Sequence, residues 1–263
     1  MQIQVLVASL DQSDHSLVKK MNIHTDAIIG NQCDYNSIED FQIDGNNITY
    51  LNFNERGVGL NRNNALMRAT GDILVFADDD ETFVDNYDNI IKKAYAQLPD
   101  ADAIIFNIVT SGEDKEHRSD SKVRRARIYN CLNYGAPRIT VLNSSVKKHN
   151  ITFHSQFGGG AIYSSGEDSL FIGDMISNKL KVYIYPAVIA YVDQTTSTWF
   201  KGYNEKYFYD KGVFFAALAA KFGRLLCLLL LLKNRKRYFN NTSELLCGIV
   251  RAMKGYGDFK KRK

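Results

Sequence analysis

Residues 73–81 read Ile-Leu-Val-Phe-Ala-Asp-Asp-Asp-Glu, and this stretch indicates the class of fold. The short apolar run follows Gly71 and is typical of a buried strand in a parallel sheet. Three aspartates, Asp78–Asp80, stand at the carboxyl end of that strand. Open α/β sheets bind their ligands at this edge, so the stretch predicts a ligand site on such a sheet.

The three adjacent carboxylates also indicate which ligand binds there. Like charges repel one another at this distance unless a cation lies among them. Ligand sets made only of oxygen suit Mg²⁺ or Mn²⁺, which proteins commonly share with the phosphates of a substrate. A solvated acidic turn is the structural alternative for Asp78–Asp80, and we favour a metal and phosphate site over it.

The first hundred residues alternate apolar runs with helix-like stretches. This alternation predicts an α/β fold, in which βαβ units build a mostly parallel sheet flanked by helices. Later segments are aromatic and rich in glycine, with a less regular rhythm, which predicts a mixed second half. The predicted strands are Ile3–Ala8, Ala27–Asn31, Ile48–Phe53, Ile73–Ala77 and Ala103–Val109, and the predicted helices are Ser16–Asn22, Val58–Ala69 and Val84–Gln97.

A glycine-rich segment opens the predicted helix before the acidic strand. Residues 55–63 read Glu-Arg-Gly-Val-Gly-Leu-Asn-Arg-Asn. The backbone amides of such a helix start, together with an arginine such as Arg56 or Arg62, can bind a diphosphate or a sugar. The segment does not satisfy the dinucleotide-binding fingerprint, and a plain surface charge is the alternative for Arg62. Its position one helix before Asp78–Asp80 favours the functional interpretation.

A second acidic motif follows the run Gly158–Gly160. Residues 165–172 read Ser-Gly-Glu-Asp-Ser-Leu-Phe-Ile, so Glu167 and Asp168 precede an apolar helical pattern. Asp168 could cap that helix, which would be ordinary structure. A carboxylate in a cleft could instead accept a proton from an attacking hydroxyl. The glycines could let the backbone approach a ligand closely or could make a turn.

Charge is distributed unevenly along the 263 residues. The net charge is +4, but residues 233–263 contain ten Lys or Arg and two acidic residues, which gives this segment +8. The body of the chain is therefore mildly acidic. Four widely spaced cysteines form no metal-ligand pattern, and we expect free thiols in a reducing cytoplasm. The N-terminus lacks the basic lead and the apolar stretch of a signal peptide.

One apolar segment raises the question of a membrane. Val213–Leu232 is mostly apolar but contains Lys221, Gly223 and Arg224. Charges near the centre of a spanning helix are costly, so we do not expect a span. Two interpretations stay open: an amphipathic helix on an anionic membrane surface, or a C-terminal helix packed on the core with a solvated basic tail.

The order of the motifs resembles the family-two glycosyltransferases, which have the GT-A nucleotide-sugar-binding fold. A first strand, an Arg-Asn helix, an apolar strand ending in Asp-x-Asp, a glycine-rich strand and Glu-Asp at a helix start follow one another from Ile3 to about Trp199. The chain looks closest to bacterial members that build capsule or surface polysaccharide. The resemblance implies an inverting transfer from a nucleotide-diphosphate sugar, commonly UDP-linked, to an acceptor hydroxyl, assisted by Mn²⁺ or Mg²⁺.

The resemblance also implies catalytic and metal-binding roles for individual residues. Asp78 and Asp80 match the Asp-x-Asp pair, with Asp80 on the metal and Asp78 facing the ribose or the waters of the metal. Asp168 matches the general base, with Glu167 beside it. Many relatives carry a late histidine as a metal ligand, and this chain has Asp193 in that neighbourhood. A carboxylate suits the same cations.

The implied donor pocket draws on several parts of the chain. Ala8 and Ser9 end the first strand, and Asp34 follows the second strand. Arg62 matches the family's helix arginine near the diphosphate. The residues implied to bind the donor are Ala8, Ser9, Asp34, Arg56, Arg62, Asp78 and Asp79.

We therefore expect two domains. Residues 1–200 form the GT-A domain, with a nucleotide-sugar-binding half at 1–110 and an acceptor-side half at 111–200, and residues 201–263 form a helical, basic extension. The expected partners are a nucleotide-diphosphate sugar and an oligosaccharide or lipid-linked saccharide acceptor. An anionic membrane surface is a third candidate, and nucleic acid is not expected. The expected location is the cytoplasm, with peripheral attachment at the inner face of the cytoplasmic membrane.

Two other functions fit parts of the sequence. Asp78–Thr82 matches the Asp-x-Asp-x-Thr pattern of haloacid-dehalogenase-type phosphohydrolases, in which the first aspartate is a phosphorylated nucleophile. Gly173-Asp174 could mimic their late acidic motif. That pattern normally ends the first strand, whereas three predicted strands precede it here. The other alternative is a non-catalytic protein that acts at a membrane surface or on nucleic acid through its basic tail.

Overall fold

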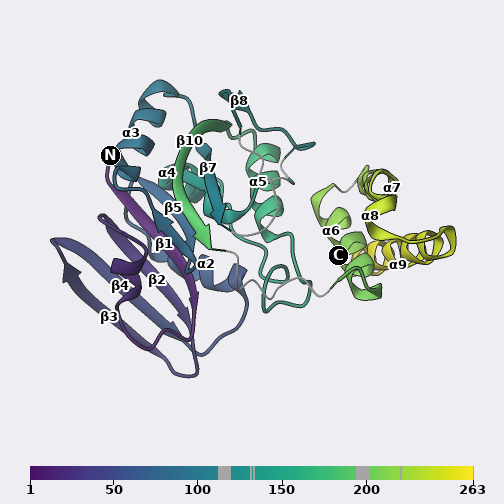
Figure 1. The fold of residues 1–263 in the computed structure, drawn as a ribbon, viewed down its shortest axis with the longest axis horizontal. Coiled ribbons are helices and arrows are strands. Elements are labelled where there is room, and N and C mark those ends of the chain that lie inside the picture. The colour runs from purple at the N-terminus through teal and green to yellow at the C-terminus, as the bar shows by residue number, and fades with distance from the viewer. Residues whose placement is uncertain (112–119, 131, 133, 194–201, 220, 263) are drawn as a thin grey trace. The chain divides into compact units, whose positions relative to one another are not determined.

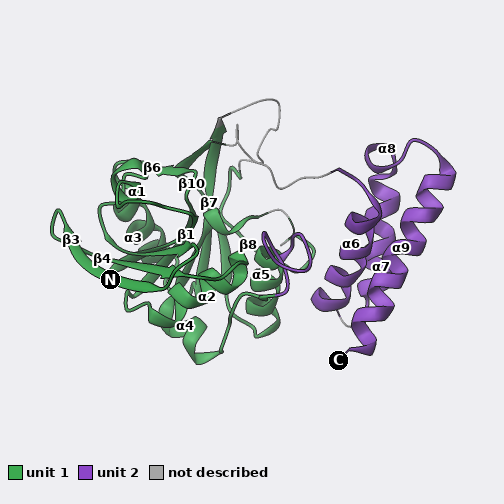
Figure 2. Cartoon of the chain, turned by 90° about the horizontal axis from the view of Figure 1, so that it is seen from below, with its two compact units in different colours: residues 1–155, 167–196 green, residues 156–166, 197–263 purple. Residues whose placement is uncertain are grey.

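The computed structural model describes residues 1–111, 120–130, 132, 134–193, 202–219 and 221–262. The chain forms two compact units (Figure 2). The predicted boundary at residue 200 and the end of the family resemblance at Trp199 lie outside the described residues. Unit 1 comprises Met1–Ser155 and Glu167–Thr196, and unit 2 comprises Gln156–Gly166 and Ser197–Lys263.

Unit 1 is built on a mixed sheet with helices on both faces (Figure 1). Each strand and helix predicted over its first 110 residues is present, with ends that differ by a few residues. The strands are β1 Ile3–Leu10, β2 Asp26–Gln32, β3 Ser37–Ile43, β4 Asn46–Phe53, β5 Ile73–Asp78, β6 Glu81–Phe83, β7 Ala103–Ser111, β8 Arg124–Arg125, β9 Ile139–Leu142 and β10 Val182–Asp193. The helices are α1 Leu17–Lys20, α2 Val58–Arg68, α3 Tyr87–Gln97, α4 Asn143–Lys148, α5 Glu167–Ser177 and the 3₁₀ turn Ala136–Arg138.

The main strands of the sheet run in one direction, so their carboxyl ends meet at one edge. The order across the sheet is β3-β4-β2-β1-β5-β9-β7-β10-β6. β4, β2, β1 and β5 are parallel neighbours. β9 is antiparallel to both β5 and β7, and β10 is parallel to β7. The prediction of a GT-A type α/β fold with a mostly parallel sheet and a mixed second half is confirmed.

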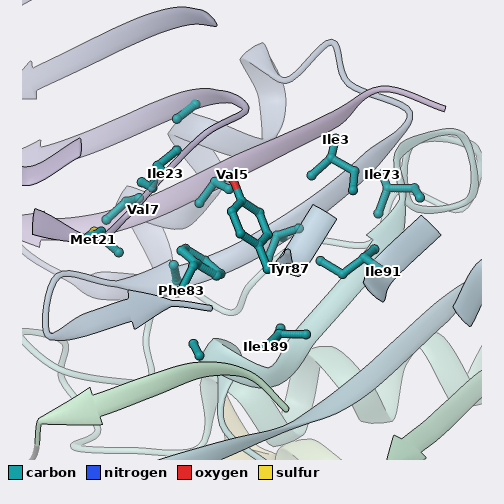
Figure 3. Close-up of a cluster of buried hydrophobic side chains, with 14 of the residues drawn as sticks. Ile3, Val5, Val7, Met21, Ile23, Ile73, Phe83, Tyr87, Ile91 and Ile189 are labelled. Atoms are coloured by element: carbon teal, nitrogen blue, oxygen red, sulfur yellow. The ribbon is translucent and has the colours of Figure 1, made fainter. Parts of the chain in front are cut away.

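The central strands are buried on both faces, which explains their unbroken apolar runs. Every residue of β1 except Leu10 is buried, and so is every residue of β5 except Asp78. One face of the sheet packs against α1 and α3, and Val5 of β1 and Tyr87 of α3 belong to the same buried apolar cluster (Figure 3). The Tyr87 hydroxyl and the Thr25 hydroxyl share a 2.7 Å hydrogen bond, so this buried polar group has a partner.

Helices α2 and α5 pack on the opposite face. Phe76 of β5 meets Phe171 of α5 edge-on, with ring centres 5.4 Å apart. Helix α2 lies unusually close to β2, because a Cβ added to Gly30 would come within 2.5 Å of the Asn61 side chain. This close approach holds the next residue of α2, Arg62, at the carboxyl edge of the sheet.

The hairpin of β3 and β4 is an element that the prediction missed. Asp44 and Gly45 connect the two strands with φ angles of 50° and 82°, the left-handed pair that a type I′ turn needs. β3 alternates half-buried and exposed residues because it forms an edge of the sheet. The Asp-Gly pair ahead of a predicted strand was the available signal.

Residues 156–166, which the sequence placed with the GT-A domain, group with unit 2. They include Gly158–Gly160, where the Ala161 N–H donates to the Gly158 carbonyl over 3.1 Å. Gly158 and Gly160 have φ angles of 99° and 76°, which favour glycine. This run therefore makes a turn, and the expectation of a glycine-rich strand is wrong.

Unit 2 is helical, as expected for the C-terminal extension. Helices α6 and α9 pack closely, because a Cβ on Gly212 would collide with the Ala252 carbonyl and a Cβ on Gly255 with the Tyr209 carbonyl. The helices are α6 Glu205–Leu218, α7 Gly223–Lys233, α8 Arg235–Tyr238 and α9 Thr242–Lys261.

The expectation of one helix over Val213–Leu232 is wrong. Helix α6 ends at Leu218 and α7 begins at Gly223, so the apolar run is shared between two helices. Gly223 lies so close to the Phe215 carbonyl that a Cβ would not fit, and this allows α7 to pack against α6. None of the described helices is long and apolar enough to cross a membrane.

Candidate active site

The carboxyl edge of the sheet gathers the acidic residues predicted to bind metal. Asp78 ends β5, and Asp193 ends β10. The backbone N–H of Asp193 donates to the Asp80 carbonyl over 3.0 Å, which places these two residues side by side. The short strand β6 follows directly after Asp80 and pairs with β10, which holds the connection. The tertiary structure thus brings the three predicted metal ligands to one edge.

Arg62 connects this edge to the start of α5. Its Nη2 lies 2.5 Å from Asp78 Oδ1, and its Nη1 lies 3.0 Å from Asp168 Oδ1 and 3.2 Å from Glu167 Oε1. The arginine side chain is only 3% exposed, so Arg62 is not a surface charge. Helix α5 begins at Glu167 and the Asp168 carboxylate binds Arg62, so Asp168 does not cap the helix. We call Arg62, Asp78, Glu167 and Asp168 the Arg62 cluster.

The Arg62 cluster has one positive charge for three carboxylates. Burial lowers the pKa of Arg62, but the pull of Asp78, Asp168 and Glu167 outweighs it and holds the pKa above its ordinary value. Burial, followed by repulsion from Glu167, raises the pKa of Asp168 well above its ordinary value, and Arg62 opposes only part of this rise. A carboxylate with a raised pKa is a stronger proton acceptor. The Asp168 side chain is 24% exposed, so a substrate can approach it.

Apolar and backbone groups hold the cluster in place. The Arg62 guanidinium lies over the ring of Phe153, 5.4 Å from its centre, in a cation–π arrangement. Phe153 in turn stacks on Phe171 with ring centres 4.2 Å apart. The backbone N–H of Ala136 also donates to Asp168. Asp168 is therefore restrained by two donors of different elements, as a positioned proton acceptor requires.

Asp79 and Asp80 have the charge properties of a cation site. Burial raises the pKa of Asp80 to about 6, and the neighbouring Asp78, Asp79 and Asp193 add to the rise. Burial likewise raises the pKa of Asp79. Carboxylates with such excess negative charge fit a bound divalent cation. No group of three acidic, His or Cys side chains within the described part of the chain is already arranged as a metal centre. Mg²⁺ commonly needs only one or two carboxylates plus substrate phosphates, so the residues fit a cation that binds together with a nucleotide.

The residues implied to line the nucleoside pocket lie near the same edge. Ala8 is buried and stands in register with Asp78. Ser9 is also buried, and its hydroxyl donates to the Gly30 carbonyl over 3.1 Å. Asp34 is exposed in the loop after β2. Of these residues, Asp34 is thus the one whose side chain a ligand can reach directly.

Arg56 connects the loops around this edge. Its Nη1 donates to the Cys33 carbonyl over 2.7 Å, and its Nη2 lies 3.5 Å from Asp11 Oδ1. The Arg56 side chain is 50% exposed. It therefore has both the charge and the access to contact an anionic ligand.

A network of hydrogen-bonded side-chain amides, which the sequence did not predict, crosses the carboxyl edge of the sheet. Asn31 of β2 donates to Asn52 of β4 over 2.8 Å and to the Gln12 carbonyl over 3.0 Å. The Gln12 amide then donates to Asp79 over 3.2 Å. Asn31 and Asn52 are almost fully buried. An asparagine near the end of an otherwise apolar strand is the sequence signal that could have predicted this hydrogen-bond network. The network holds the loop after β1 next to Asp79.

Glu81 is a second residue that the sequence analysis missed. It is 1% exposed, and its Oε1 accepts a hydrogen bond from the Asp78 backbone N–H over 2.6 Å. Its Oε2 has no hydrogen-bond partner among the described residues. Burial, followed by repulsion from Asp78, raises the pKa of Glu81 well above its ordinary value. Burial therefore favours the protonated form of Glu81, whose hydrogen bond with Asp78 shapes the turn that carries Asp79 and Asp80.

Replacing Glu81 with Gln should preserve the free energy of unfolding near pH 4.5, whereas Ala should lower it by about 1–3 kcal/mol at the same pH. Gln can accept the hydrogen bond of the Asp78 N–H without bearing a charge, while Ala leaves that buried N–H unsatisfied. Urea unfolding followed by circular dichroism measures both effects.

A pH series provides the control for this prediction. Above pH 4.5, the ordinary value, the unfolded chain loses the Glu81 proton that the folded chain retains, so the wild-type free energy of unfolding falls as pH rises. The Gln variant lacks this contribution. Its free energy of unfolding should therefore increase relative to that of the wild type as pH rises. An identical pH dependence for the two proteins would contradict a neutral Glu81.

A comparison with families of known proteins finds a match to this sequence. Residues 33–161, just under half of the chain, match the family model of glycosyl transferase family 2. This segment includes Arg62 and Asp78–Asp80 and ends before Glu167 and Asp168. No curated protein matches the chain significantly.

Solved structures show that the fold is that of the GT-A glycosyltransferases. The structure of S. aureus TarS residues 1–349 in complex with UDP-GlcNAc aligns with a TM-score of 0.66 at 13% identity, covering 98% of this chain and 80% of that one. The same TarS fragment in complex with UDP aligns with a TM-score of 0.61 at 11% identity, covering 100% and 92%. The mannosyltransferase PcManGT from Pyrobaculum calidifontis, in complex with GDP-Man and Mn²⁺, aligns with a TM-score of 0.52 at 13% identity, covering 97% and 87%.

The fold also argues against the phosphohydrolase alternative. Asp78 ends β5, and Asp79 and Asp80 follow it, so this motif does not end the first strand. Gly173 and Asp174 lie inside α5, away from any strand end. The Asp78 carboxylate is bound to Arg62, which would weaken it as a nucleophile.

Proposed function

We propose that the protein is an inverting glycosyltransferase, which moves a sugar from a UDP-linked nucleotide sugar to an acceptor hydroxyl with the help of Mn²⁺ or Mg²⁺. The observation that carries the proposal is the Arg62 cluster, which joins Asp78 at the end of β5 to Asp168 at the start of α5. The family-2 match and the nucleotide sugars bound in the TarS and PcManGT structures support this class of donor.

In this proposal Asp168 is the general base. Its carboxylate takes the proton of the acceptor hydroxyl while that oxygen attacks the anomeric carbon. The bond from this carbon to the leaving diphosphate breaks on the opposite face, so the anomeric configuration inverts. Arg62 and the Ala136 N–H hold the carboxylate in one orientation, and the raised pKa of Asp168 strengthens it as a proton acceptor.

Asp80, together with Asp78 and Asp193, would hold the divalent cation. Such a cation, when bound, neutralises the charge that develops on the leaving diphosphate. We assign Arg62 to positioning, because its guanidinium is buried against three carboxylates. Arg56 is the exposed arginine at this edge that can contact phosphate oxygens.

Replacing Asp80 with Ala should weaken the Mn²⁺-dependent binding of UDP by at least about 10–100-fold. The substitution removes a carboxylate that the cation needs. It leaves the hydrogen bonds between the side-chain amides of Asn31 and Asn52, and from Gln12 to Asp79, intact. Isothermal calorimetry with UDP, in the presence and absence of Mn²⁺, measures the loss.

The matched control is Asp40→Ala, an exposed aspartate on the edge strand β3. It should bind UDP and Mn²⁺ as the wild type does. An unchanged affinity of Asp80→Ala for UDP in the presence of Mn²⁺ would show that the cation does not bind at the end of β5. Release of phosphate from a generic phosphomonoester, with no UDP released from UDP sugars, would point to a phosphohydrolase.

We further place the reaction in surface-polysaccharide assembly of the capsule type, in the cytoplasm at the inner face of the membrane. The acceptor is then an oligosaccharide or a lipid-linked saccharide. The charge of +8 on residues 233–263 supports a location next to anionic lipid. A thermal-shift screen of nucleotide sugars with and without Mn²⁺ identifies the donor, and transfer assays with soluble and lipid-linked acceptors test the rest.

A further inference from the structure

Helix α7 exposes one apolar face. The positions repeat at intervals of three and four residues and therefore lie on one side of the helix. The opposite side, with Gly223, Cys227 and Leu231, is buried. The exposed side chains and their exposed fractions are Phe222 68%, Leu225 55%, Leu226 36%, Leu229 52% and Leu232 48%.

An uninterrupted apolar face of this kind is unusual on the surface of a soluble domain and marks an interaction site. Single exposed leucines need no explanation, but five large apolar side chains in one stripe do. Exposed lysines stand at both ends of the stripe, Lys221 before α7 and Lys233 as its last residue. Long lysine side chains can direct their ammonium groups away from an apolar surface into a polar layer.

Positive charge continues directly after the stripe. Lys233, Arg235, Lys236 and Arg237 are all exposed. Arg235 and Lys236 also line a hollow of about 230 Å³ in this unit. A surface that combines an apolar stripe with this charge is complementary to an anionic lipid interface.

We propose that unit 2 docks on an anionic lipid bilayer, with the apolar face of α7 lying in the membrane plane and the flanking lysines and arginines on lipid headgroups. A second copy of the chain is a poorer occupant, because it would bring two segments of charge +8 together. An amphipathic helix of this type lies in the headgroup layer and does not span the bilayer. The proposal does not depend on the transferase activity, since lipid binding needs no substrate.

Cosedimentation of the full chain with vesicles tests the proposal. Vesicles made of equal parts phosphatidylcholine and phosphatidylglycerol should bind the protein, and vesicles of phosphatidylcholine alone should bind it more weakly. The double variant Leu225→Glu/Leu229→Glu should bind the anionic vesicles about a hundredfold more weakly, because each leucine contributes roughly tenfold. The double variant Lys233→Glu/Lys236→Glu should lose the preference for anionic vesicles and the salt dependence of binding.

The control is Ile38→Glu, which places the same charge at a residue that is 54% exposed on β3 of unit 1. It should bind vesicles as the wild type does. The leucine positions are exposed, so the thermal midpoint of that double variant should equal that of the wild type. Three results would overturn the proposal: a wild-type chain that binds neither vesicle, undiminished binding by the leucine variant, or a wild-type oligomer in solution that the leucine variant dissociates.

Discussion

Asp168→Asn should reduce sugar transfer by about 10²–10⁴-fold and leave the affinity for UDP nearly unchanged. Asn has the shape of Asp, and its carbonyl oxygen can still accept the hydrogen bond of Arg62, so the site should keep its structure. It cannot take a proton from the acceptor hydroxyl. The rate of UDP release in the presence of donor and acceptor measures the loss, and calorimetry measures the affinity for UDP.

A matched control for this variant lies in the same helix. Asp174 is exposed on α5, so Asp174→Asn should keep wild-type turnover. In the wild type, kcat/KM should rise with pH through an apparent pKa above that of an ordinary carboxyl, because burial and Glu167 raise the pKa of Asp168. Normal turnover in Asp168→Asn would show that another group removes the proton.

Arg62→Met should lower the free energy of unfolding by about 3–5 kcal/mol at neutral pH. The substitution leaves Asp78, Glu167 and Asp168 close together without their shared cation. Arg62→Lys retains the charge but loses the two-pronged geometry of the guanidinium, so its loss should be smaller. Urea unfolding followed by circular dichroism measures both variants.

The pH dependence of the Met variant distinguishes lost charge from lost packing. Without Arg62, the pKa of Asp168 rises further above its ordinary value in the folded state, so the folded variant holds a proton that the unfolded chain has lost. Its stability therefore falls as pH rises, and the deficit against the wild type should be smaller near about pH 5 than near about pH 8. The control Arg68→Met removes an exposed arginine from the same helix. An equal effect of the two substitutions would contradict a central role for Arg62.

The relation between sequence and structure differs between the two halves of unit 1. The strands from β1 to β7 that the sequence predicted contain apolar runs, which local pattern identifies, and β1 and β5 are buried on both faces. β3 was missed because an edge strand is only half buried and alternates weakly, although Asp44-Gly45 marked its turn. The short strands β6 and β9 contain too few residues to show a period, and their pairing to distant strands defines them.

The local sequence pattern also did not predict where helix α6 ends and helix α7 begins. The run Val213–Leu232 has the hydrophobicity of one helix, yet α6 ends and α7 starts within it. Helix α7 starts where Gly223 lies against the Phe215 carbonyl, a contact between residues of two different helices. A window along the sequence does not contain that contact.

The α/β class, the acidic strand end at Asp78–Asp80 and the Glu167-Asp168 motif could all be predicted from the sequence, because each depends on neighbouring residues. The contacts of Arg62 with Asp78, Glu167 and Asp168, and the burial of Glu81, arise only when the chain folds. Burial and the sum of nearby charges determine the protonation of these groups, and both depend on which distant segments the fold brings together.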